Sequence, residues 1–154
     1  MPWTFTATGA ISEDEVKPDE TRGYLFAAGL FALPQDFTLA FDYEYTSDRT
    51  YLLDYDFSSK DILDSAIGIS RVRSDELISA SVTNFESLRE ADIGNERSGL
   101  IELDYRRNWE PASVGGLLEF RLIGQSQSFE DNIRNEIDSP NVNQVRGTVD
   151  YRRD

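Results

Sequence analysis

Hydrophobic and polar residues alternate along most of the chain, in short segments separated by polar connections. The clearest segment is 37–45, where large apolar or aromatic residues at every second position are separated by Thr, Ala, Asp and Glu. Because successive side chains of a β-strand point to opposite faces, this segment is predicted to form a strand with one apolar and one polar face. The same pattern predicts eight strands, at residues 3–11, 22–33, 37–46, 62–73, 76–88, 99–109, 117–129 and 144–153.

The connections between these segments are long and short in strict turn. The long ones are 12–21, 47–61, 89–98 and 130–143, and the short ones are 34–36, 74–75 and 110–116. In an up-and-down antiparallel sheet every second connection lies at the same end, so all the long connections are expected to share one rim. Short turns at one rim and long loops at the other are typical of bacterial outer-membrane barrels. The sequence therefore predicts an all-β fold in a single domain over 1–154, an antiparallel up-and-down meander of about eight strands that is part of a large transmembrane β-barrel.

The predicted polar face carries many charges. Nine of them lie on the clearest strands: Asp42, Glu44, Glu102, Asp104, Arg106, Arg121, Arg146, Asp150 and Arg152. The interior of a closed eight-stranded barrel is filled by side chains, and each buried ion costs several kcal/mol unless it is well paired, so this face is expected to contact water. Two arrangements satisfy that demand. The face lines the lumen of a much wider barrel, or it is the outside of a soluble β-sandwich or small barrel that binds a carbohydrate or hydrophobic ligand.

Aromatic residues favour the wide barrel, because they gather toward both ends of the predicted strands, as the headgroup zones of a bilayer select. One group is expected near the short turns and the other near the long connections. The first contains Trp3, Phe5, Phe31, Phe37, Tyr105, Trp109 and Tyr151, and the second contains Tyr24, Tyr43, Tyr45, Phe85 and Phe129.

Composition removes several classes of function. The 29 acidic against 15 basic residues give a net charge of −14, which repels phosphate backbones, so no nucleic-acid partner is expected. Histidine and cysteine are absent, which removes thiol chemistry, imidazole bases and Cys/His metal sites, and no enzyme activity is predicted. A glycosidase using two carboxylates is a third class, and Asp54 and Asp56 are the first pair to consider for it.

Acidic residues concentrate in the long connections, where carboxylates could bind Ca²⁺ or Mg²⁺. No connection has the ligand spacing of an EF-hand, so these residues are interpreted as a solvated surface and no cofactor is predicted.

The start of the chain does not read as a signal peptide, since Met1, Pro2 and Trp3 lead directly into a strand pattern without a basic or apolar region. No stretch reaches the ~18 consecutive apolar residues that a membrane helix needs. If the protein reaches an outer membrane, its export signal lies upstream of Met1 and the chain is expected to be a fragment.

Two consecutive stretches resemble a known family. SDRTYLLDYDFSSKD (47–61) and LDSAIGISRVRSDELISASVTNFESLRE (63–90) resemble the C-terminal barrel of the LPS-assembly protein LptD, also called organic solvent tolerance protein. YRRNWEPASVGGLLEF (105–120) and VRGTVDYRRD (145–154) are similar to later strands of that barrel. The resemblance touches most of 20–154, which corresponds to the middle of the barrel without its first and last strands or the periplasmic jelly-roll domain.

The resemblance implies a protein of the bacterial cell outer membrane that inserts lipopolysaccharide (LPS) into the outer leaflet. Its implied partners are LPS, the outer-membrane lipid bilayer and an LptE-like lipoprotein. The chain would form a wall segment of this translocon. Arg106, Arg121, Arg146 and Arg152 are the candidate lumen contacts for LPS phosphates, because guanidinium groups bind phosphate in planar pairs. The alternative is that they pair with Asp104, Glu119, Asp150 or other carboxylates across the strands.

Overall fold

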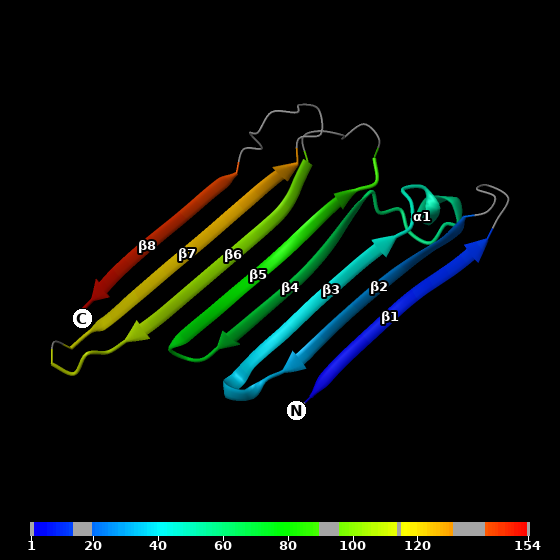
Figure 1. Ribbon diagram of the computed structural model, residues 1–154. Coiled ribbons are helices and arrows are strands. Elements are labelled where there is room, and N and C mark those ends of the chain that lie inside the picture. The colour runs from blue at the N-terminus through cyan, green and yellow to red at the C-terminus, as the bar shows by residue number, and fades with distance from the viewer. Residues whose placement is uncertain (1, 14–19, 90–95, 114, 131–140, 154) are drawn as a thin grey trace.

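The computed structural model describes residues 2–13, 20–89, 96–113, 115–130 and 141–153. They form one antiparallel sheet of eight strands in chain order (Figure 1). The strands are β1 (Trp3–Glu13), β2 (Thr21–Ala32), β3 (Phe37–Thr46), β4 (Ile62–Val72), β5 (Glu76–Ser87), β6 (Glu96–Trp109), β7 (Leu117–Glu130) and β8 (Val142–Arg152). The predicted meander is confirmed, and every predicted strand boundary lies within three residues of the observed one.

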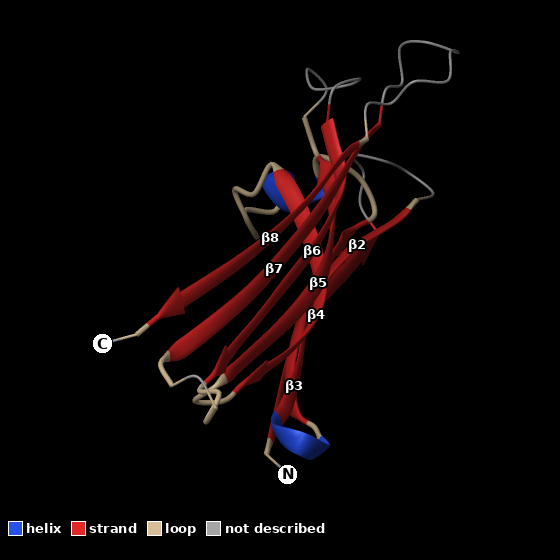
Figure 2. Ribbon diagram, turned by 90° about the vertical axis from the view of Figure 1, so that its left-hand side faces the viewer, coloured by secondary structure: helices blue, strands red, loops and turns tan. Residues whose placement is uncertain are grey.

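Each strand pairs only with its neighbours in sequence, and the sheet does not close on itself within the described residues (Figures 1 and 2). The strands β1 and β8 therefore each have one edge without a partner strand. The connections between β2 and β3, β4 and β5, and β6 and β7 lie at the rim that also carries the start of β1 and the end of β8. The strand ends that the long connections join lie at the opposite rim, as predicted.

The pairing register assigns each side chain to one face of the sheet, because residues opposite each other in a ladder point to the same side. One row crosses all eight strands with apolar residues alone: Trp3, Phe31, Leu39, Ile69, Ala80, Leu103, Gly124 and Val145. The neighbouring row on the other face runs through Thr38, Ser70, Ser79, Asp104, Ile123 and Arg146. All nine charges predicted for the polar face lie on it. The two faces are called the apolar face and the polar face below.

The apolar face is largely uncovered. Exposed large side chains on it include Trp3, Phe5, Tyr43, Ile67, Val82, Ile101, Trp109, Phe120, Val145 and Tyr151. In the described residues the buried hydrophobic side chains are limited to Ala27, Tyr51, Leu52 and Leu63. The soluble alternative required the apolar face to pack inside a compact body, and the described structure has no such interior.

Two short helices lie in the described parts of the connections. A 3-10 turn, η1 (Pro34–Asp36), joins β2 to β3, and α1 (Tyr51–Asp54) lies in the long connection between β3 and β4. The alternating pattern did not predict α1. No helix in the described part of the chain is long and apolar enough to cross a membrane.

Tyr24 and Phe85 lie toward the long-connection ends of their strands, as predicted. The register puts both on the polar face, however, so they do not belong to an aromatic belt on the apolar face. The reason for Tyr24 is visible in its contacts, since its ring packs against Tyr51 and Phe57 of the connection 47–61.

Candidate functional site

The polar face has two parts with different surroundings. Near the long connections, residues 47–61 fold over the polar face of β1 and β2, and we call this segment the cap (Figure 1). On β6, β7 and β8 the polar face is charged, and no described residue of a connection covers it. We call that part the charged strip, and it comprises Glu102, Asp104, Arg106, Glu119, Arg121, Arg146, Asp150 and Arg152.

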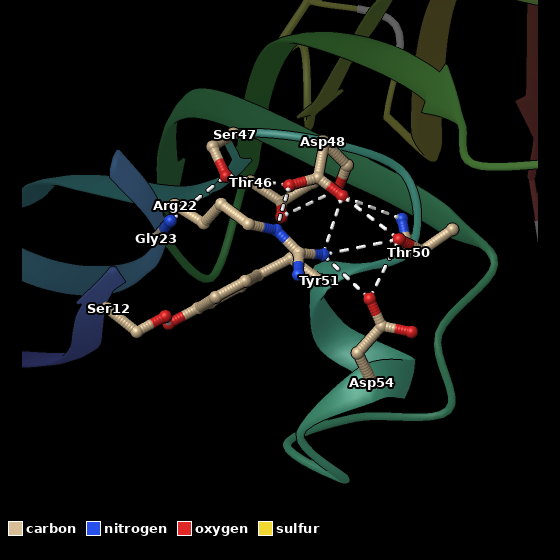
Figure 3. Close-up of polar contacts among 9 residues, drawn as sticks. All are labelled: Ser12, Arg22, Gly23, Thr46, Ser47, Asp48, Thr50, Tyr51 and Asp54. Carbon is tan, nitrogen blue, oxygen red and sulfur yellow. Dashed lines mark hydrogen bonds and ion pairs between the residues drawn. The ribbon is translucent and has the colours of Figure 1, made fainter. Parts of the chain in front are cut away.

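Arg22 connects the cap to the sheet (Figure 3). It stands near the start of β2, and its side chain is only 1% exposed. Its Nε donates to Asp48 Oδ2 at 2.8 Å, and its Nη2 donates to Asp48 Oδ1 at 3.0 Å and to Asp54 Oδ2 at 2.7 Å. A buried charge is tolerated when it is paired and hydrogen-bonded, and both carboxylates come from the cap. Arg22 therefore holds the cap against the polar face.

The carboxylates around Arg22 are ionised. The hydrogen bond from Arg22 holds the pKa of Asp48 well below its ordinary value, although burial acts in the opposite direction. The pKa of Asp54 is also lowered, first by Arg22 and then by the hydroxyl of Thr50. A glycosidase acid needs a raised pKa, so the environment of Asp54 is the reverse of what that chemistry requires.

The cap has a small apolar core of its own. Tyr51 and Leu52 are fully buried, and the rings of Tyr51 and Phe57 lie 5.9 Å apart. Tyr51 also lies under the guanidinium of Arg22, with the Arg22 Cζ 5.1 Å from the ring centroid, and its hydroxyl accepts a hydrogen bond from Ser12 of β1. These contacts keep this part of the polar face covered.

Lys60 ties the other end of the cap to the sheet. Its Nζ donates to Glu44 Oε1 at 2.5 Å and to Asp64 Oδ1 at 2.8 Å, so it joins β3 to β4. Burial lowers the pKa of Lys60, but the hydrogen bonds to the two carboxylates outweigh it, and the net shift raises the pKa. Lys60 therefore stays protonated.

Like charges stand directly opposite one another in the charged strip. Arg106 pairs in register with Arg121, and Glu119 pairs in register with Asp150. Opposite charges in the strip contact each other only between residues that are offset by two positions in the ladder, that is, diagonally. Arg121 Nη2 lies 3.0 Å from Asp104 Oδ2. Arg106 Nε lies 4.0 Å from Glu119 Oε1. Directly opposed like charges destabilise a sheet, so this arrangement leaves the two arginines incompletely neutralised.

The four predicted arginines all lie on the polar face, but they differ in their ion pairs. Arg106 and Arg121 are neighbours, and each has an ion pair with a diagonal carboxylate, so the alternative of cross-strand pairing holds for both. The pair of Arg121 is hydrogen-bonded, whereas the Nε of Arg106 makes no hydrogen bond among the described residues. Arg146 and Arg152 on β8 are exposed and make no ion pair among the described residues. Their contact with LPS phosphates stays a prediction.

A shallow hollow of about 250 Å³ lies beside the Arg121 to Asp104 pair on the polar face. Its polar lining comes from three adjacent strands: Ser79, Ser81, Glu102, Asp104 and Gln125. Hydroxyl, amide and carboxylate groups therefore converge where the charged strip begins.

The acidic connections are only partly described. Residues 14–19, 90–95 and 131–140, which hold many of the carboxylates considered for Ca²⁺ or Mg²⁺, lie outside the described residues. Among the residues that are described, no group of three or more potential metal ligands occurs. The interpretation of these connections as a solvated surface without a cofactor therefore stays a prediction.

The alternating pattern predicts neither the cap nor the role of Arg22. A signal was nevertheless present, because the connection 47–61 contains five large apolar or aromatic residues that a solvated loop does not need: Tyr51, Leu52, Leu53, Tyr55 and Phe57. Such a density predicts a loop that packs against something.

The chain matches the family model of LptD, LPS transport system D, over residues 20–150, which takes in nearly all of β2 to β8. Comparisons with curated proteins and with solved structures found no match. The family is one of bacterial outer-membrane proteins with a role in LPS transport, and it is not an enzyme family. Together with the eight-stranded antiparallel meander and its two contrasting faces, the match over most of the chain shows that this protein belongs to the LptD family.

Proposed function

We propose that this chain is a wall segment of an outer-membrane translocon that inserts LPS into the outer leaflet. The observation that supports it most directly is the row of apolar residues that crosses all eight strands. Four of its members are exposed, namely Trp3, Ile69, Leu103 and Val145, and the other four are half-buried. An exposed apolar face of this size is suited to acyl chains, and the opposite face, with its charges, is suited to an aqueous lumen.

The edges of β1 and β8 extend this proposal. In hydrocarbon every backbone N–H and C=O must be hydrogen-bonded, so an open sheet cannot span a bilayer alone. Each edge therefore joins a further strand of a barrel wider than eight strands. In that barrel the short turns face the periplasm and the long connections face the cell exterior, as in other outer-membrane barrels.

The mechanism is physical and involves no covalent chemistry. The charged strip offers guanidinium groups and carboxylates to the phosphates and sugars of LPS, while the apolar face anchors the wall in the bilayer. Arg106 and Arg121 form one contact point, and Arg146 and Arg152 form the exposed cations beside it. An LptE-like lipoprotein is the partner expected with this role.

Two adjacent residues of β5 test which face meets lipid. Ser81 lies on the polar face and Val82 on the apolar face at almost the same depth, and the chain has no native cysteine to interfere with labelling. The protein is reconstituted in bilayers with a spin label on Ser81→Cys or on Val82→Cys. The Val82 label should be accessible to molecular oxygen and the Ser81 label to a water-soluble nickel reagent. Water access at Val82 with lipid access at Ser81 would refute the proposal.

A second pair on β8 tests the substrate. Thr148 lies on the polar face directly opposite Arg121, and Val149 lies on the apolar face. A photo-crosslinking amino acid at Thr148 should capture LPS in cells, as detected by immunoblotting, whereas one at Val149 should capture much less. Equal capture at the two positions, or none at Thr148, would contradict an LPS path along the charged strip.

A further inference from the structure

One group of charged residues lies on the apolar face, where the wall of a membrane barrel is expected to carry apolar residues. In the described strands, the half of the apolar face nearer the short turns carries three charged side chains, Arg71 of β4, Glu76 of β5 and Arg107 of β6. They are adjacent, since Glu76 is directly opposite Arg107. Asp75, in the turn before β5, completes the group. We call these four residues the rim cluster.

Glu76 is the buried residue of the rim cluster and contacts both of its arginines. It is buried, accepts a hydrogen bond from Arg107 Nη1 at 2.9 Å and forms an ion pair with Arg71. Arg71 also lies over an aromatic ring, with its Cζ 4.5 Å from the centroid of Phe37. One carboxylate therefore fixes two guanidinium groups in place on a surface that is otherwise apolar.

The exposed part of the rim cluster is one cation beside one anion. Arg107 and Asp75 are 45% and 49% exposed, and Arg107 Nη2 lies 3.1 Å from Asp75 Oδ2. The Nε of Arg71 is buried and has no hydrogen-bond partner among the described residues. The two arginines and two carboxylates sum to zero charge. The rim cluster thus presents one exposed positive and one exposed negative group and has no net charge.

The surroundings of the rim cluster are suited to acyl chains. Arg107 is directly opposite Phe120 of β7, whose ring lies 6.0 Å from that of Tyr105. Charged residues on the lipid face of a barrel cost about 2–4 kcal/mol at the bilayer midplane and ~0–1 kcal/mol near the interface. A cluster next to the short turns therefore lies at headgroup depth.

We propose that the rim cluster binds the headgroup of a zwitterionic phospholipid that carries a phosphate and a primary ammonium, as phosphatidylethanolamine does. The phosphate contacts Arg107, and the ammonium contacts Asp75. A phospholipid with an anionic headgroup brings no ammonium to Asp75, and one with a quaternary amine has no N–H to donate to it. This inference rests on the proposed function, because it requires the apolar face to meet lipid.

Lipid retention in native mass spectrometry tests this proposal. The detergent-purified protein is titrated with phosphatidylethanolamine, phosphatidylcholine and phosphatidylglycerol of equal acyl length. The wild type should retain phosphatidylethanolamine about fivefold better than the other two, the preference expected from one partly exposed ion pair. Asp75→Asn should reduce that preference to near unity, and Arg107→Gln should weaken retention of all three lipids.

Arg73→Gln is the matched control. Arg73 lies at the same rim and forms an exposed ion pair with Asp36 at 2.9 Å, but it is not in the rim cluster. Its replacement should leave the lipid preference unchanged. Equal retention of the three lipids by the wild type, a preference for phosphatidylglycerol, or an unchanged preference in Asp75→Asn would overturn the proposal.

The spin label on Val82→Cys separates failure of this inference from failure of the proposed function. If that label is in lipid and the three phospholipids are still retained equally, only the rim-cluster proposal is wrong. If the label is in water, the apolar face does not meet lipid and both proposals are wrong.

Discussion

The capped and the open parts of the polar face use the same residue types for different purposes. Under the cap, Arg22 is almost completely buried and makes hydrogen bonds to two carboxylates. In the charged strip, Arg121 is 38% exposed and has one diagonal carboxylate. An arginine whose donors are used internally holds structure together, whereas one with free donors on an open face is available to a substrate. The surroundings decide the role of an arginine here.

The difference originates in the connections. The connection 47–61 carries apolar residues that must be buried, so it folds onto the sheet and brings Asp48 and Asp54 to Arg22. The connection between β6 and β7 is short and lies at the opposite rim. Among the described residues, the charged strip has no cover comparable to the cap.

The largest effect should come from Arg22→Met. Removing the guanidinium leaves Asp48 without its main partner, and breaking a largely buried ion pair costs about 4 kcal/mol. The cap should detach, as measured by the free energy of unfolding in detergent and by protease cleavage within 47–61. Arg49→Met, which alters an exposed residue of the same connection, is the control. Similar losses in the two variants would show that the cap does not depend on Arg22.

The apolar part of the cap is tested by two consecutive leucines. Leu52 is fully buried and Leu53 is 61% exposed. Leu52→Ala should lower the free energy of unfolding by about 3 kcal/mol, because it opens a cavity in the small core. Leu53→Ala should change it by less than about 0.5 kcal/mol. The comparison fails if denaturant titration gives the same value for both.

In the charged strip, Arg121→Gln should alter stability little. A partly exposed ion pair such as the one between Arg121 and Asp104 contributes up to about 1 kcal/mol. LPS capture by the crosslinker at Thr148 should nevertheless fall clearly. Arg73→Gln removes an exposed ion pair of similar strength elsewhere and should leave LPS capture intact. A loss of capture in both variants would show that overall charge, and not the charged strip, attracts LPS.

The smallest effect concerns pH. Since the pKa of Asp48 is lowered in the folded protein, its contribution to stability is complete above the ordinary carboxyl value of about 4 and is lost as the pH falls toward the lowered value. Protection of the cap from protease should therefore be the same at pH 8 and pH 5, and should decrease only in stronger acid, as followed with an acid-active protease. A decrease already at pH 6 would contradict the ion pair with Arg22.

The strands were predictable because alternation with a period of two needs only neighbouring residues in the sequence. The cap was not, since Arg22 meets its partners 26 and 32 residues further along the chain and no periodicity links them. The rim cluster has one visible signal in the sequence, because Arg107 occupies a position where the alternating pattern expects an apolar residue, between Tyr105 and Trp109. The pattern alone does not explain why a charge stands there. Its partner Glu76 belongs to another strand, so the pairing emerges only from the register.

The meander also carries a consequence for how the chain assembles. Every strand finds its hydrogen-bond partners in the segment just before or just after it, so each hairpin can form without waiting for distant parts of the chain. The cap is the exception, because its anchor Arg22 lies on β2 and its contacts come after β3. We expect the hairpin of β2 and β3 to form first and the cap to pack onto it afterwards. Substitutions at Arg22 or Leu52 would delay this late step without changing the pairing of the strands.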